Sequence, residues 1–160
     1  MDELPPVMLE QGRLRATLEG ARVYGREHPD EFGGLNWIND EPVRVVFWAT
    51  DHLDDHRRAL AAGRVEHPER VVVRQCRYTE RQVDAWLDEV HRLLVDRPRT
   101  PRVTSWGQHL GEDGIGIQVT IWPWSDEGAE WVRDKLAPIP IEVAAMPPAK
   151  FLGPYSAGQP

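Results

Sequence analysis

The residues with the clearest capacity for chemistry lie together in the segment His52-Leu53-Asp54-Asp55-His56. Two histidines four positions apart on a helix project from neighbouring turns, so both rings could bind one metal ion. A catalytic zinc site needs a third protein ligand, and His109 could supply it. The first hypothesis is therefore a metal-dependent hydrolase that uses His52, His56 and His109.

The same histidines also have a structural interpretation. His56 borders the apolar stripe of Leu53 and Leu60, which predicts a partly buried ring with one hydrogen bond, and His52 falls in the first helical turn near the surface. The order His-x-x-Asp-His is similar to the inverted zinc-peptidase motif, but the shorter Asp stands where Glu is expected. We favour the structural interpretation and keep the hydrolase as the alternative.

Other reactive side chains have simpler explanations. Asp51, Asp54 and Asp55 crowd a predicted helix start, where the helix dipole stabilises acids. Cys76 follows an apolar strand, which predicts a buried and inert thiol. No glycine-rich phosphate loop precedes a helix, so we expect no cofactor and assign no catalytic residue.

The tryptophans give the main functional hypothesis. The chain has 7 of them, and Trp48 and Trp122 occupy equivalent places at the ends of two predicted strands. Large aromatic side chains on an open sheet face are typical of surfaces that bind partners. The predicted binding residues are Trp48, Trp106, Trp122, Trp124, Thr104 and Gln118. The sequence thus favours a non-catalytic binding or protein-interaction module, whose partner is another protein or a second copy.

An alternative for these tryptophans stays open at this point. Tryptophan is highly buried on average. The helix predicted at 8–24 could cover the tryptophan-bearing face and make it a second small core.

Hydrophobic periodicity and turn signals indicate the elements that would position these residues. The predicted helices are 8–24, 51–62, one from 79 that Pro98 and Pro101 end, and one that begins at 125 and ends before Pro138. The predicted strands are 35–38, 43–49, 69–77, 102–110, 115–122 and one that begins at 139. From residue 69 onward the order is β-α-β-β-α-β, which is the ferredoxin-like order.

The expected fold is a single α+β domain over residues 1–160. It has an N-terminal helix at 8–24, a core at 43–145 and an irregular tail at 146–160. In this fold the ferredoxin-like core is preceded by an extra β-α unit, and the helices lie mainly on one face of a mixed or antiparallel sheet.

Composition limits the function classes. The formal net charge is -7, which repels phosphate backbones and anionic membrane surfaces, so a nucleic-acid or membrane function is not favoured. A single cysteine rules out an intramolecular disulfide. The N-terminus has no signal-peptide pattern and no apolar run of about 18 residues occurs, so we expect a cytoplasmic protein.

Short motifs carry a resemblance to known proteins. They are Ala21-x-x-Tyr24-Gly25, His28-Pro29, Phe32-Gly33-Gly34-Leu35, Thr50, His56-Arg57-x-Ala59-Leu60 and His67-Pro68-x-x-Val71. These motifs resemble parts of uncharacterised actinobacterial βαβ proteins. The strand–helix arrangement is also distantly similar to the propeptide domains of bacterial chymotrypsin-like proteases. Such propeptides bind a partner's surface as folding aids and inhibitors, so the resemblance implies binding rather than catalysis.

Overall fold

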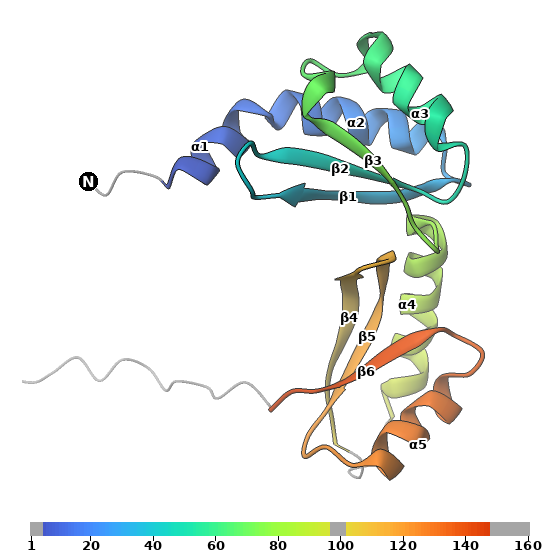
Figure 1. The fold of residues 1–160 in the computed structure, drawn as a ribbon. Helices are drawn as coiled ribbons and strands as arrows, with labels where there is room; N and C mark the ends of the chain where they lie inside the picture. The colour runs from blue at the N-terminus through green and yellow to red at the C-terminus, as the bar shows by residue number, and fades with distance from the viewer. Residues whose placement is uncertain (1–4, 97–101, 148–160) are drawn as a thin grey trace, which may run out of the picture. The chain divides into compact units, whose positions relative to one another are not determined.

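The computed structural model describes residues 5–96 and 102–147 of the chain (Figure 1). Its helices are α1 (Pro6–Arg13), α2 (Arg15–Glu27), α3 (Leu53–Ala59), η1 (Leu60–Arg64), η2 (Pro68–Arg70), α4 (Glu80–Leu94) and α5 (Asp126–Leu136). Its strands are β1 (Phe32–Ile38), β2 (Arg44–Ala49), β3 (Val71–Gln75), β4 (Val103–Gly111), β5 (Gly114–Ile121) and β6 (Ile141–Ala145). The α+β class is confirmed, with strands and helices interleaved along the chain.

The strands form two mixed sheets of three strands each. In the first sheet β2 lies between β1, which is antiparallel to it, and β3, which is parallel to it. In the second sheet β5 lies between β4 and β6, and β6 runs parallel to β5.

This division corrects the expectation of one ferredoxin-like sheet. The order β3-α4-β4-β5-α5-β6 is present along the chain, but β3 pairs with β2 and belongs to the other sheet. The physical reason is the apolar character of β2, whose residues Val45 to Ala49 are all buried. A strand buried on both faces is a central strand, and Val71–Gln75 supplies its second neighbour.

The described chain divides into two compact units. Unit 1 comprises the residues up to Glu89 together with Gln108–Gly116. Unit 2 comprises Val90–Gly107 together with the residues from Ile117 onward. The chain passes between the units within α4 and within each strand of the β4–β5 hairpin. The single domain expected over residues 1–160 stays a prediction.

In unit 1, the first sheet has an apolar core on each face. The helix α2 lies along one face (Figure 1), where Ala21 and Tyr24 pack with Phe47 of β2 and Leu60 of η1. The opposite face carries a smaller cluster of Val46, Trp48 and Cys76, against which Ile38 packs. Alternating side chains of β2 therefore enter two different cores.

The N-terminal segment is two helices rather than the single one expected at 8–24. The chain bends at Leu14, which is buried and lies between α1 and α2. The helix α1 buries none of its residues, whereas α2 buries four, which are Thr17, Ala21, Tyr24 and Gly25.

In unit 2, apolar residues at regular spacing are buried. Ile117, Val119 and Ile121 are buried on β5, and so is Thr120 between them. Ala129, Val132 and Leu136 are buried on α5, which Ser125 caps by accepting a 3.0 Å hydrogen bond from the Gly128 N–H. Pro98, Pro101 and most of the tail predicted at 146–160 lie outside the described residues. Across the described ranges, the structure contains no helix that is both long and apolar enough to cross a bilayer.

Candidate functional site

The indole of Trp48 is buried, which corrects its assignment to an open face. Trp48 is 4% exposed, and its indole Nε1–H donates a hydrogen bond of 2.5 Å to Asn36 Oδ1. The turn of the β4–β5 hairpin lies against it, because a Cβ added at Gly114 would be 3.6 Å from Trp48 Cε3. The helix α2, which was the expected cover, packs on the other face of this sheet. Trp48 is therefore part of the core of unit 1.

Trp106 is half-buried and lies against α4. Its ring centroid is 5.8 Å from that of His91. In the same strand, Thr104 and Ser105 both place a hydroxyl 2.7 Å from that of Thr120 on β5.

Trp122, Trp124 and Met146 form what we call the aromatic surface of unit 2. Their residues are 41%, 43% and 48% exposed. The Met146 N–H donates to the Ile121 carbonyl at 3.2 Å, which places Met146 beside the end of β5 where Trp122 follows. The Trp124 Nε1–H donates to Asp126 Oδ1 at 3.1 Å, which orients the second indole at the start of α5.

Thr104 and Gln118 make polar contacts within the second sheet. The Thr104 hydroxyl donates to the Met146 carbonyl at 3.0 Å, so Thr104 adjoins the aromatic surface. The Gln118 amide donates to Glu142 Oε1 at 3.2 Å across the β5–β6 pair. Of the six predicted binding residues, the structure brings Thr104, Trp122 and Trp124 to this end of unit 2.

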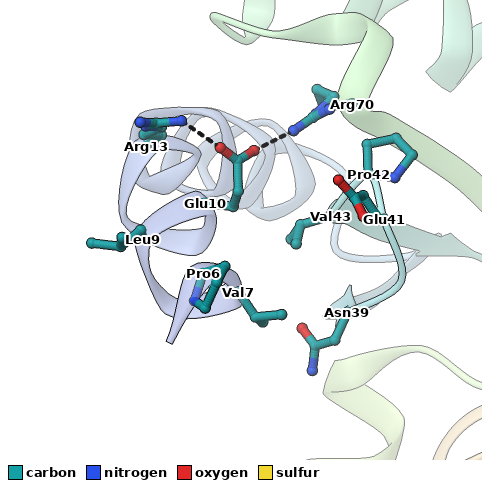
Figure 2. A pocket seen from close by; sticks show the side chains of 10 residues that line it. All are labelled: Pro6, Val7, Leu9, Glu10, Arg13, Asn39, Glu41, Pro42, Val43 and Arg70. Carbon is teal, nitrogen blue, oxygen red and sulfur yellow. Dashed lines mark hydrogen bonds and ion pairs between the residues drawn. The ribbon is translucent and has the colours of Figure 1, made fainter. Parts of the chain in front are cut away.

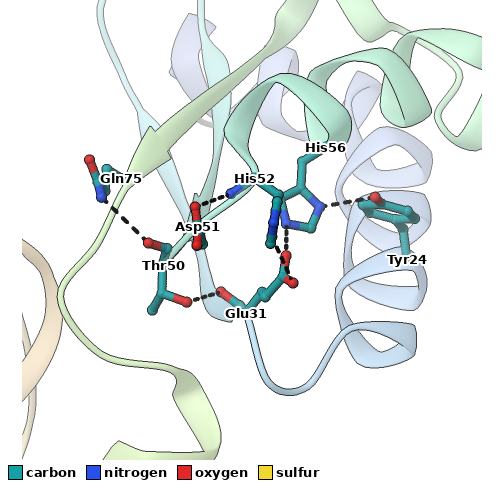
Figure 3. Close-up of polar contacts among 7 residues, drawn as sticks. All are labelled: Tyr24, Glu31, Thr50, Asp51, His52, His56 and Gln75. Carbon is teal, nitrogen blue, oxygen red and sulfur yellow. Dashed lines mark hydrogen bonds and ion pairs between the residues drawn. The ribbon is translucent and has the colours of Figure 1, made fainter.

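The predicted metal-site histidines both contact one carboxylate instead (Figure 3). His52 Nδ1 is 3.1 Å from Glu31 Oε1, and His56 Nε2 is 2.9 Å from Glu31 Oε2. His56 is 2% exposed, and its Nδ1 is 2.9 Å from the Tyr24 hydroxyl. Tyr24, His56, Glu31 and His52 are thus joined by hydrogen bonds in that order. We call these four side chains the Tyr24–His52 network. It runs from the core of unit 1 to its surface.

The two rings converge on Glu31, although His52 lies just outside the helix. His52 has φ 51 and ψ 37, so it is in the left-handed region and precedes the first residue of α3. Among the residues that the structure describes, no three His, Cys, Asp or Glu side chains are grouped so that they could hold a metal ion. The third histidine of the hypothesis, His109, is in β4. The hydrolase alternative is not carried forward.

The chemistry of the groups assigns one donor in this network. A carboxylate can only accept, so His56 donates from Nε2 to Glu31, and its Nδ1 shares a hydrogen bond of 2.9 Å with the Tyr24 hydroxyl. Burial raises the pKa of Tyr24 above its usual value of 10.0, which keeps the donor proton in place. The hydrogen bond to Glu31, with the nearby charge of Asp51, raises the pKa of exposed His52. The network therefore gives both ring nitrogens of the buried His56 a hydrogen-bond partner.

Sequence reasoning missed Glu31 and Tyr24. Glu31 lies 21 and 25 residues before its histidine partners, in a turn-forming stretch where an acid is unremarkable. Tyr24 could have indicated the network from the sequence, because it lies on the inner stripe of a predicted helix and a buried tyrosine hydroxyl needs a polar partner.

The remaining reactive groups have local roles. Arg57 pairs with Asp54 at 2.5 Å, Arg58 pairs with Asp55, and Asp51 accepts the His52 N–H at 2.7 Å. Cys76 is 5% exposed, and burial raises the pKa of its thiol to about 11.

No protein-family model matches this chain, and a search of curated proteins returns no match.

Proposed function

We propose that the chain is a non-catalytic protein-interaction module that binds its partner through the aromatic surface of unit 2. The observation that supports this proposal is the exposure of two neighbouring indoles, Trp122 and Trp124, together with Met146. Exposed apolar area gains free energy when a partner covers it, at roughly 25 cal/mol per Å².

The composition and the rigidity of this surface both suit recognition. Tryptophan and methionine are enriched in protein interfaces, and tryptophan is among the commonest hot-spot residues. The hydrogen bond from Trp124 to Asp126 holds one indole in place before binding. A side chain that is already ordered loses less conformational entropy on association.

The polar groups beside the indoles would give the interface direction. The Thr104 hydroxyl lies next to Met146, and Asp126 carries a carboxylate at the start of α5. Apolar anchors with a polar rim are the usual organisation of a protein interface. The resemblance to protease propeptides supports the same class of function, because those domains act by binding a protein surface.

Site-specific crosslinking would test the proposal. A photoreactive phenylalanine analogue replaces Trp122 or Trp124 in the full chain, which is expressed in its source cells. Val23 of α2 is the matched control position, because it is apolar and 49% exposed but lies in unit 1. We expect a discrete crosslinked product from positions 122 and 124 and none from position 23.

The crosslinked product identifies the partner. A product of twice the chain's mass indicates a second copy, and any other discrete mass indicates a different protein. A purified bacterial chymotrypsin-like protease is the first separate partner to test, and inhibition that Trp122→Ser abolishes would identify it. Equal crosslinking at position 23, or none at 122 and 124, would overturn the proposal.

A further inference from the structure

A hollow of about 620 Å³ lies in unit 1 among α1, the β1–β2 connection and the start of β3 (Figure 2). Small-molecule sites commonly have volumes of about 300–1,000 Å³, are largely apolar and carry a few placed polar groups. This hollow lies in a different unit from the aromatic surface.

The walls combine apolar and charged side chains. Val7 of α1 and Val43, next to β2, supply apolar surface together with Pro42. The charged residues in the walls are two arginines and two glutamates, namely Arg13, Arg70, Glu10 and Glu41. The lining is therefore electrically neutral overall, although it contains four charges.

Glu10 links the two arginines of the wall. It accepts from Arg13 at 2.6 Å and from Arg70 at 2.6 Å, so its two oxygens connect α1 to η2 (Figure 2). Gln11 donates to Asn39 Oδ1 at 2.8 Å, which connects α1 to the β1–β2 connection. The Arg70 side chain is 23% exposed and held by Glu10, whereas the Arg13 side chain is 75% exposed.

The charge arrangement indicates the kind of ligand. Arg13, Glu10 and Arg70 together carry one net positive charge, which suits a carboxylate. Glu41 adds one negative charge in the same lining, which suits an ammonium group. A ligand with a single charge would satisfy one of these and leave the other without a counter-charge.

We propose that this hollow binds a zwitterionic ligand with an apolar side chain, which is the chemistry of a free apolar α-amino acid or a short apolar peptide. The ligand carboxylate contacts Arg70 and Arg13, its ammonium group contacts Glu41, and its side chain packs on Val7 and Val43. The inference is independent of the proposed protein-interaction role.

Variants of this wall are expected to fold, because α1 buries none of its residues and Glu41 is exposed. Binding is measured by titrating the isotope-labelled full chain and following backbone NMR resonances of α1 and the β1–β2 connection. The probes are L-leucine, leucyl-leucine, isoamylamine and isocaproate. The last two reproduce the leucine side chain with only the amine or only the carboxylate.

We expect saturable shifts with L-leucine or leucyl-leucine, and whichever binds more tightly identifies the source of the ligand. Isoamylamine and isocaproate should each bind at least about tenfold more weakly, since one charge-assisted hydrogen bond is lost. Glu41→Gln and Arg70→Gln should weaken binding by a similar factor, and Val7→Trp should abolish it by filling the hollow. Glu66→Gln, at an exposed glutamate elsewhere in unit 1, is the matched control.

The proposal is overturned if neither zwitterion produces saturable shifts in this region. It is equally overturned if the singly charged probes bind as tightly as leucine, or if Glu41→Gln and Glu66→Gln behave alike. Crosslinking at Trp122 is a separate readout, so loss of leucine binding leaves the proposed function unaffected.

Discussion

Replacing Tyr24 with phenylalanine should destabilise unit 1 by removing one hydroxyl from the Tyr24–His52 network. Tyr24 is 4% exposed and its ring packs near Phe47 at 5.7 Å, and phenylalanine retains that packing. The change leaves His56 Nδ1 without its hydrogen-bond partner at a residue that is 2% exposed. The substitution therefore isolates one buried hydrogen bond.

The expected magnitude follows from the burial of the orphaned nitrogen. A buried polar atom left without a partner costs about 1–3 kcal/mol, because water cannot replace the lost bond. Glu31 keeps both His52 and His56 as partners, so its own hydrogen bonds are unchanged. We expect Tyr24→Phe to lower the free energy of unfolding of unit 1 by about 1–3 kcal/mol.

Native-state hydrogen exchange of the β2 amides measures this loss within unit 1. The double variant Tyr24→Phe/His56→Leu replaces both polar partners with apolar ones, and its cost should be less than the sum of the single variants. A coupling energy of about 0.5–3 kcal/mol is typical of residues in contact. If Tyr24→Phe costs under about 0.5 kcal/mol, as a neutral surface change would, the assigned bond is not formed.

Three further predictions concern single residues. Glu31→Gln should lower the pKa of His52 in an NMR titration, because the Glu31 hydrogen bond is the first cause of its elevation. Protonated His52 stabilises the folded state fully below its unfolded pKa of about 6.5, and this contribution is lost as pH rises through the raised folded pKa. An unchanged pKa of His52 in Glu31→Gln would contradict the His52–Glu31 hydrogen bond. Cys76 should resist Ellman's reagent in the folded protein and react on denaturation, since its pKa is about 11 and it is buried; rapid native reaction would contradict its burial. Trp48→Ala should lower the unfolding free energy by about 3–5 kcal/mol, and Trp122→Ala by about 1 kcal/mol; equal losses in thermal or denaturant unfolding would refute the difference in burial.

Local structure was predictable because its causes are local. The sequence Thr79-Glu80-Arg81-Gln82 has the spacing of a capping box, and the structure forms it. The Gln82 side chain accepts the Thr79 N–H at 3.0 Å, and the Gln82 N–H donates to the Thr79 hydroxyl at 3.2 Å. Gly63 has φ +96 where the end of a helix was expected, a conformation that glycine adopts without strain. The alternation along β5 likewise follows directly from strand geometry.

Strand pairing was not predictable from the same patterns. The sequence shows that Val71–Gln75 is an apolar strand, but it does not show which neighbour that strand joins. An edge position beside β2 and a position in a ferredoxin-like sheet have the same alternation and the same apolar content. The choice depends on β2, which needs a partner on each side to satisfy its backbone groups in a buried position.

The burial of Trp48 shows the same limit for a functional residue. Side chains alternate along a strand, so Trp48 and Phe47 point to opposite faces, and the two enter different clusters of unit 1. This alternation does not show what covers each face. The residue that lies against Trp48 is Gly114, far along the chain. Glycine is required there because its φ is +94 and because a side chain would collide with Cys76. Trp122 directly follows β5 and stays 41% exposed. Two tryptophans that look equivalent in the sequence thus differ in burial, because different parts of the chain lie against them.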